Sequence, residues 1–236
     1  HLIHNDNRIA TTDRSHESRS STAWTCGNAV VIAGVQSNYK MSFSTGGLFL
    51  NETLAVARLH VAGEPWAATI TRALSEGATS LPKAASQRRT LREIVNRLST
   101  LTDTERDYFV SEADREDQLA LLWLATCRAY RFVREFATEV LRERYLSFHL
   151  ELPLEAFDIL FAAKAEWDDG LESISSSTRA KLRQVLFRMM REAHVISDDG
   201  KIQSAIMSSR LKGMLELECP ADLDLFPRIS RDGAAR

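Results

Sequence analysis

The sequence predicts a mainly α-helical protein, a multi-helix globular unit that contains helix-turn-helix-like parts. Three observations support this fold class. From position 50 onward, apolar residues recur at spacings of three and four, which is the period of a helix. Ser, Thr or Asp residues that can cap a helix precede most of these segments. With 236 residues, 44% of them hydrophobic, the chain is long enough to bury a core.

Residues 1–38 differ from the rest of the chain in composition. They are rich in Ser, Thr, Asn, Asp and Arg and show no regular apolar period before a small patch at their end. We expect a disordered or non-native N-terminal tail here. His1, His4 and His16 lie in this tail, but no second pair of ligands accompanies them, so we expect no metal site.

The first helical part is predicted over residues 39–112 as a helix-turn-helix-like subdomain. Ser44 or Thr45 is expected to cap the first helix, and Gly63 to end it. A second helix begins after Pro65, which the first turn of a helix tolerates. Ser86 and Thr102 are the expected caps of a third and a fourth helix. The third helix carries three arginines on one flank, Arg88, Arg89 and Arg92.

Central core helices are predicted over residues 113–150. The stretch 118–146 contains few helix breakers, and its first half is apolar on nearly every side, as expected of a helix enclosed by others. We expect one central core helix with a kink near Cys127. This cysteine lies in the apolar half, which favours packing over a role as a nucleophile.

The C-terminal part, residues 151–236, is predicted as a winged-helix-like subdomain. Pro153 begins one helix, and Ser177 is expected to cap the next, over 178–194. The turn "SDDG" and the strand candidate "KIQSAI" then predict a short β-hairpin as the wing. Ser208 or Ser209 is expected to cap the last helix.

One face of the 178–194 helix has the residue types that bind nucleic acid. At 100° per residue, Leu182, Val185, Leu186, Met189 and Ala193 share one side, and Lys181, Gln184, Arg188 and Arg191 share the other. Arg can bond guanine, Gln can bond adenine and Lys binds phosphate. A solvated helix face is the alternative interpretation. The predicted DNA-binding residues are Lys181, Gln184, Arg188 and Arg191, with Arg88, Arg89 and Arg92 as a second, weaker patch.

Enzymatic chemistry has little support in the sequence. There is no His-Glu-x-x-His, no nucleophile elbow and no phosphate loop ending in Gly-Lys-Ser/Thr, so we predict no catalytic residue and no cofactor. The formal net charge is −2, so a nucleic-acid partner would need a local basic face. Three widely spaced cysteines argue against a disulfide framework and suit a cytoplasmic protein. The apolar runs are too short to span a membrane.

Four blocks in the same order resemble the BrxA family, a small component of BREX bacteriophage-exclusion systems. They are "YKMSFSTGGLFLNETLAVARL" (39–59), "LLWLATCRAYRFVREFATEVLRERYL" (121–146), "KAEWDDGLESISSSTRAKLRQVLFRMMREAHVI" (164–196) and the late "FP" (226–227). The resemblance implies a cytoplasmic, helical, non-enzymatic DNA-binding protein that works beside a methyltransferase and other BREX components. Because it begins near Tyr39, we expect the functional protein to start close to that residue.

Two alternatives to DNA binding stay open. The family has been likened to the RNA-binding antitermination factor NusB, which makes RNA a rival partner. The near-neutral charge also suits an adaptor that holds other defence proteins together without touching nucleic acid.

Overall fold

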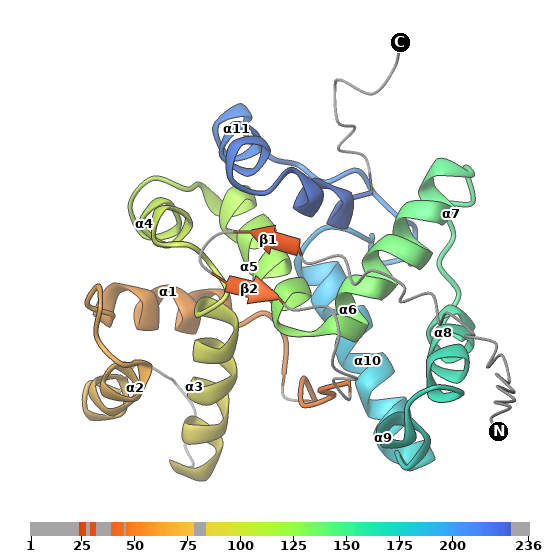
Figure 1. Cartoon of the computed structure of the whole chain (residues 1–236), viewed down its shortest axis with the longest axis horizontal. Coiled ribbons are helices and arrows are strands. Elements are labelled where there is room, and N and C mark those ends of the chain that lie inside the picture. The colour runs from red at the N-terminus through yellow and green to blue at the C-terminus, as the bar shows by residue number, and fades with distance from the viewer. Residues whose placement is uncertain (1–23, 27–28, 32–38, 45, 78–83, 228–236) are drawn as a thin grey trace, which may run out of the picture. The chain divides into compact units, whose positions relative to one another are not determined.

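The computed structural model describes residues 24–26, 29–31, 39–44, 46–77 and 84–227 (Figure 1). Two units are distinguished, residues 1–36 and residues 37–236. In the first unit, strands β1 (Trp24–Cys26) and β2 (Ala29–Val31) form an antiparallel pair with Thr25 opposite Val30. The second unit is helical, which confirms the mainly α fold class.

Four helices begin the second unit: α1 (Leu50–Leu59), α2 (Trp66–Ser75), α3 (Ala84–Leu98) and α4 (Asp103–Ser111). Helix α1 contacts the other three. It begins after Phe49, which has a φ of 57° and provides no side-chain cap, so the expectation that Ser44 caps this helix is wrong. Thr45 lies outside the described residues. Ser86 lies within α3 rather than before it.

The central stretch is broken into several helical segments. Helix α5 (Arg115–Ala129) is buried at every position from Leu119 to Cys127, which confirms the enclosed core helix. The break comes at Tyr130, three residues beyond Cys127, where φ is −129° and ψ is 105°. Three segments follow the break: α6 (Arg131–Glu135), the π-helix η1 (Phe136–Arg142) and α7 (Glu143–Leu146).

The C-terminal part contains α8 (Glu155–Ala165), α9 (Asp169–Glu172), α10 (Ser176–Glu192), α11 (Ser209–Glu218) and the 3₁₀ helix η2 (Pro220–Leu225). Ser175, not the predicted Ser177, caps α10 by accepting a hydrogen bond from the amide of Thr178. Ser208 caps α11, as one of the two predicted residues. The short helix α9 fills the connection between α8 and α10.

The prediction of a C-terminal β-hairpin is wrong, because the described residues form no pair of strands there. Around the "SDDG" turn, the described residues form only isolated bridges, Ile196 with Ile202 and Lys201 with Glu151. The backbone amide of Ile202 donates to the carbonyl of Leu150 at 2.7 Å. Because the returning chain shares its hydrogen bonds between two partners, no regular two-stranded ladder extends from the turn.

One hydrophobic core joins the helices of the second unit. Trp123, Phe136, Phe157 and Leu186 are among its buried members. None of the helices in the described ranges combines the length and the apolarity that crossing a bilayer requires.

The two described cysteine side chains differ in state. Cys127 is buried and free, and burial raises the pKa of its thiol, which suits a packing role. Cys219 is disulfide-bonded, although the spacing of the three cysteines argues against a disulfide framework.

Candidate nucleic-acid interface

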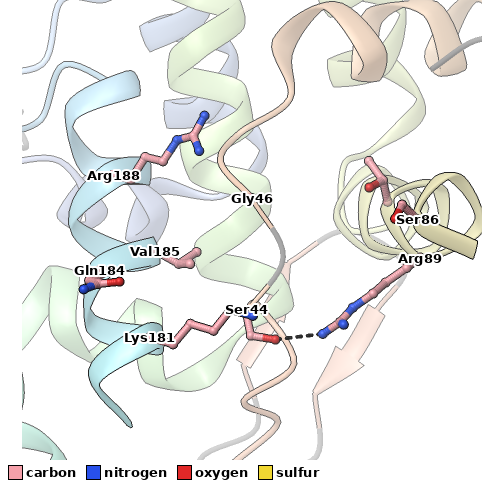
Figure 2. A pocket seen from close by; sticks show the side chains of 9 residues that line it. Ser44, Gly46, Ser86, Arg89, Lys181, Gln184, Val185 and Arg188 are labelled. Carbon is pink, nitrogen blue, oxygen red and sulfur yellow. Dashed lines mark hydrogen bonds between the residues drawn. The ribbon is translucent and has the colours of Figure 1, made fainter. Parts of the chain in front are cut away.

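A groove lies between α3 and α10, and the chain segment before α1 runs along it. We call it the α3–α10 groove, and we call residues 39–44 and 46–48 the N-terminal segment. The groove has a volume of about 440 Å³ (Figure 2). Its lining residues are Ser44, Gly46, Ser86, Arg89, Thr90, Lys181, Gln184, Val185 and Arg188.

The structure brings four of the seven predicted DNA-binding residues to this groove. Lys181, Gln184 and Arg188 line it from α10, and Arg89 lines it from α3. All four side chains are exposed. The other three predicted residues do not line the groove: Arg88 and Arg92 are exposed elsewhere on α3, and Arg191 is half-buried one turn beyond Arg188.

The polar face of α10 is fixed by packing on its opposite side. Leu182, Leu186 and Met189 are fully buried, as the helical wheel predicted. Arg179 donates to Asp158 of α8 at 2.7 Å, and Arg183 pairs with the other oxygen of the same carboxylate. Burial raises the pKa of Asp158, but these two arginines outweigh it and lower the pKa. The orientation of α10 is therefore set by both its apolar and its charged contacts.

Buried polar side chains of α3 hold the N-terminal segment in place. Arg97 donates to the carbonyl of Gly47 at 2.9 Å and to the carboxylate of Glu93 at 2.9 Å. Glu93 accepts a hydrogen bond of 2.6 Å from the hydroxyl of Tyr130. Burial and the nearby Glu93 raise the pKa of Tyr130, so this tyrosine stays a neutral donor. The helix break at Tyr130 and the path of the segment are linked through this chain of contacts.

Glu192 connects α10 to the same segment. One carboxylate oxygen accepts from Arg188 Nε at 2.7 Å, and the other accepts from the backbone amide of Leu48 at 2.6 Å. A side chain at Gly47 would meet this carboxylate, since a Cβ built there lies 2.2 Å from it. Arg188 is therefore partly neutralised, whereas Lys181 has no carboxylate partner among the described residues.

The groove lining is rich in hydrogen-bond donors and positive charge. Arg89, Lys181 and Arg188 contribute three cations, and none of the nine lining residues is a carboxylate. Ser44, Ser86 and Thr90 add hydroxyl groups. Such a set can bind an anion such as a phosphate group. Within the described residues, no group of three or more His, Cys, Asp and Glu side chains could hold a metal ion.

Sequence reasoning missed the contribution of the N-terminal segment. The "STGG" stretch was interpreted as the start of a helix, yet Ser44 and Gly46 line the groove. Gly46 has a φ of 64°, a conformation that favours glycine, so the glycine itself was a usable signal for an irregular path. Nothing local in the sequence indicated that the segment would lie between α3 and α10.

Comparisons with known proteins agree on most of this chain. The family model of BrxA matches residues 37–218. A solved structure of an uncharacterized protein from Magnetospirillum magneticum is similar with a TM-score of 0.66 and 19% identity. That similarity covers 82% of this chain and 100% of the other, and it supports the fold. No curated protein matches.

Proposed function

This chain belongs to the BrxA family and thus has a BREX-associated role, and from this premise we propose that it is a non-enzymatic DNA-binding component of that bacteriophage defence. One observation carries the proposal: the basic residues of α3 and α10, about a hundred positions apart in the sequence, line one groove without a carboxylate. In a chain of net charge −2, such a concentration of cations supports a polyanionic partner.

The chemistry of α10 suits duplex DNA. Lys181 and Arg188 can contact phosphates, and Gln184 between them can reach a base edge. In this proposal α10 enters the major groove, and the turn around Gly200 contacts the DNA backbone. The protein works beside a methyltransferase and other BREX components in the cytoplasm.

An adaptor is the second candidate, and exposed apolar side chains favour it. Phe148, Ile159 and Trp167 are 89%, 70% and 86% exposed. Exposed apolar side chains, and aromatic ones such as Phe148 and Trp167 in particular, are common at protein–protein contacts. An RNA-binding, antitermination-like role is the third, because a groove of cations does not by itself distinguish RNA from DNA.

A charge-reversal experiment tests the DNA-binding proposal. Lys181→Glu combined with Arg188→Glu should weaken duplex DNA binding by about tenfold or more, since each lost contact costs on the order of 1 kcal/mol. Fluorescence anisotropy at two salt concentrations measures the affinity, and circular dichroism checks the fold. Arg58→Glu combined with Arg115→Glu changes the net charge equally at exposed positions away from the groove, and it is the matched control.

The outcomes separate the candidates. Equal affinities of the two double variants would show that the groove is not the DNA site. Absence of binding by the unaltered protein to duplex DNA and to RNA at low salt would favour the adaptor. Tighter binding to structured RNA than to duplex DNA would favour the antitermination-like role.

A further inference from the structure

We propose that the α3–α10 groove holds a single phosphate group between Arg89 and Lys181, over the hydroxyl of Ser44. This inference rests on the proposed function, because the phosphate is taken to belong to the nucleic-acid backbone. It assigns Arg89, Lys181 and Ser44 a sequence-independent anchoring role, distinct from the base contact proposed for Gln184.

Two cations extend into the groove from opposite walls. Figure 2 shows Arg89 reaching toward Ser44 from α3 and Lys181 reaching toward Ser44 from α10. Arg188, the third cation of the lining, is bonded to Glu192 at 2.7 Å. Arg89 and Lys181 therefore carry the positive charge that no carboxylate of the described residues offsets.

The hydroxyl of Ser44 is arranged as a donor to a ligand. Its oxygen accepts a hydrogen bond from Arg89 Nη2 at 3.0 Å. A hydroxyl that accepts from a cation keeps its own proton available for another acceptor. Ser86 and Thr90 add two further hydroxyl-bearing side chains to the lining, although Thr90 is only 2% exposed. The lining thus presents guanidinium, ammonium and hydroxyl donors to one small volume, which matches the oxygens of a phosphate.

The same lining does not suit a base that has left the stack. Bases that leave the stack are bound by aromatic or guanidinium planes on which they lie. None of the nine lining residues is aromatic, and Arg89 is bonded edge-on to Ser44. Val185 is the one larger apolar side chain of the lining. A backbone phosphate is therefore the group that the groove fits best.

The salt dependence of binding counts phosphate contacts and so tests this inference. For duplex DNA, each neutralised phosphate contributes about 0.9 to the slope of log affinity against log salt. If Arg89 and Lys181 share one phosphate, Arg89→Ala combined with Lys181→Ala reduces the magnitude of this slope by about 0.9 in total. Two separate phosphates would lower it by about 1.8, and that result would overturn the inference. Arg58→Ala combined with Arg115→Ala is the control and should leave the slope unchanged.

A second measurement separates this inference from the proposed function. Inorganic phosphate, titrated against chloride at equal ionic strength, should shift the NMR amide signals around Ser44, Arg89 and Lys181, and the double alanine variant should lose these shifts. Phosphate shifts without DNA binding would refute the proposed function and keep the phosphate site. DNA binding with an unchanged slope and no phosphate shifts would refute the site and keep the function. Ser44→Ala should weaken binding without changing the slope, because it removes a donor but no charge.

Discussion

Gly47 shows how a single residue shapes the groove. The carboxylate of Glu192 occupies the space beside its Cα, where it accepts from the amide of Leu48. Leu48 is 1% exposed, so its amide has little access to water as a replacement. A glycine at this position therefore allows α10 to bind the N-terminal segment directly.

Gly47→Ala should destabilise the protein by about 1 to 3 kcal/mol, because the new methyl group displaces Glu192 and leaves a buried amide without a partner. Gly213→Ala is the matched control. Gly213 lies exposed within α11, and a Cβ there meets nothing within 4 Å. The control should stabilise by about 0.5 to 1 kcal/mol, since alanine favours a helix. Urea denaturation measures both, and equal effects would contradict this role of Gly47.

At the scale of elements, cap chemistry decided which helix starts could be predicted. Thr102 caps α4 in a full capping box with Glu105, and Ser208 caps α11. Thr102 is followed by Glu105 at the third position, as a capping box requires, whereas Ser208 caps through its hydroxyl alone. The start of α10 was harder, because the segment contains several adjacent serines of similar capping propensity. Ser175 is used rather than Ser177, and local sequence contains no signal that distinguishes them.

Helix α11 depends on a contact that the sequence could not indicate. Asp117 in the first turn of α5 is 1% exposed. It accepts from the hydroxyl of Tyr108 at 2.5 Å and from the backbone amide of Ser208 at 2.8 Å. The hydroxyl of Ser208 also donates to it, while the same oxygen caps α11. Burial and the bond to Asp117 raise the pKa of Tyr108.

Asp117→Ala should therefore cost about 2 to 4 kcal/mol, because it removes the shared acceptor of the buried Tyr108 hydroxyl and of the partly buried amide and hydroxyl of Ser208. Asp114→Ala provides the comparison. Asp114 caps α5 from an exposed position, so its loss should cost about 1 kcal/mol. Hydrogen exchange should show faster opening of α11 in the Asp117 variant alone. Unchanged protection of α11 amides would mean that Asp117 does not anchor this helix.

For the molecule as a whole, the sequence predicted which side of a helix is buried and which is polar, but not which polar sides lie next to each other. The helical period identified the buried and polar sides of α10, because that pattern is local. Arg89 and Lys181 converge because α3 and α10 both pack against α5, and these contacts are long-range in the sequence. The wing was predicted from a turn signal, but the competing partner, Leu150, lies about fifty residues away. The prediction of the wing thus failed because a segment distant in the sequence provides a hydrogen-bond partner.

Glu135 is a second point where distant segments meet. It accepts from the hydroxyl of Tyr39 at 2.5 Å, from Arg131 Nε at 2.7 Å, and it pairs with Lys164 Nζ at 3.1 Å. The three partners belong to the N-terminal segment, α6 and α8. Burial raises the pKa of Glu135, but the hydrogen bonds from these partners outweigh it and lower the pKa. The ionised carboxylate therefore stabilises the fold.

This shift gives the pH dependence of stability a definite sign. A carboxyl group whose pKa is lowered on folding contributes stability above its ordinary value of 4.5, and that contribution is lost as the pH falls below it. Glu135→Gln should therefore cost on the order of 2 kcal/mol at pH 7, since hydrogen bonds to charged groups are lost. The difference from the unaltered protein should shrink in acid. Urea denaturation at pH 7 and at progressively lower pH measures it.

Glu139→Gln controls for the loss of a charge beside the same lysine. Glu139 lies 2.8 Å from Lys164 Nζ but is 47% exposed, so its removal should cost less than about 1 kcal/mol. Because Glu135 also holds Tyr39, its variant alone should loosen the start of the N-terminal segment, which leads into the α3–α10 groove. If the free energy of unfolding lost in Glu135→Gln stays constant as the pH falls, the charge of Glu135 does not provide the stabilisation.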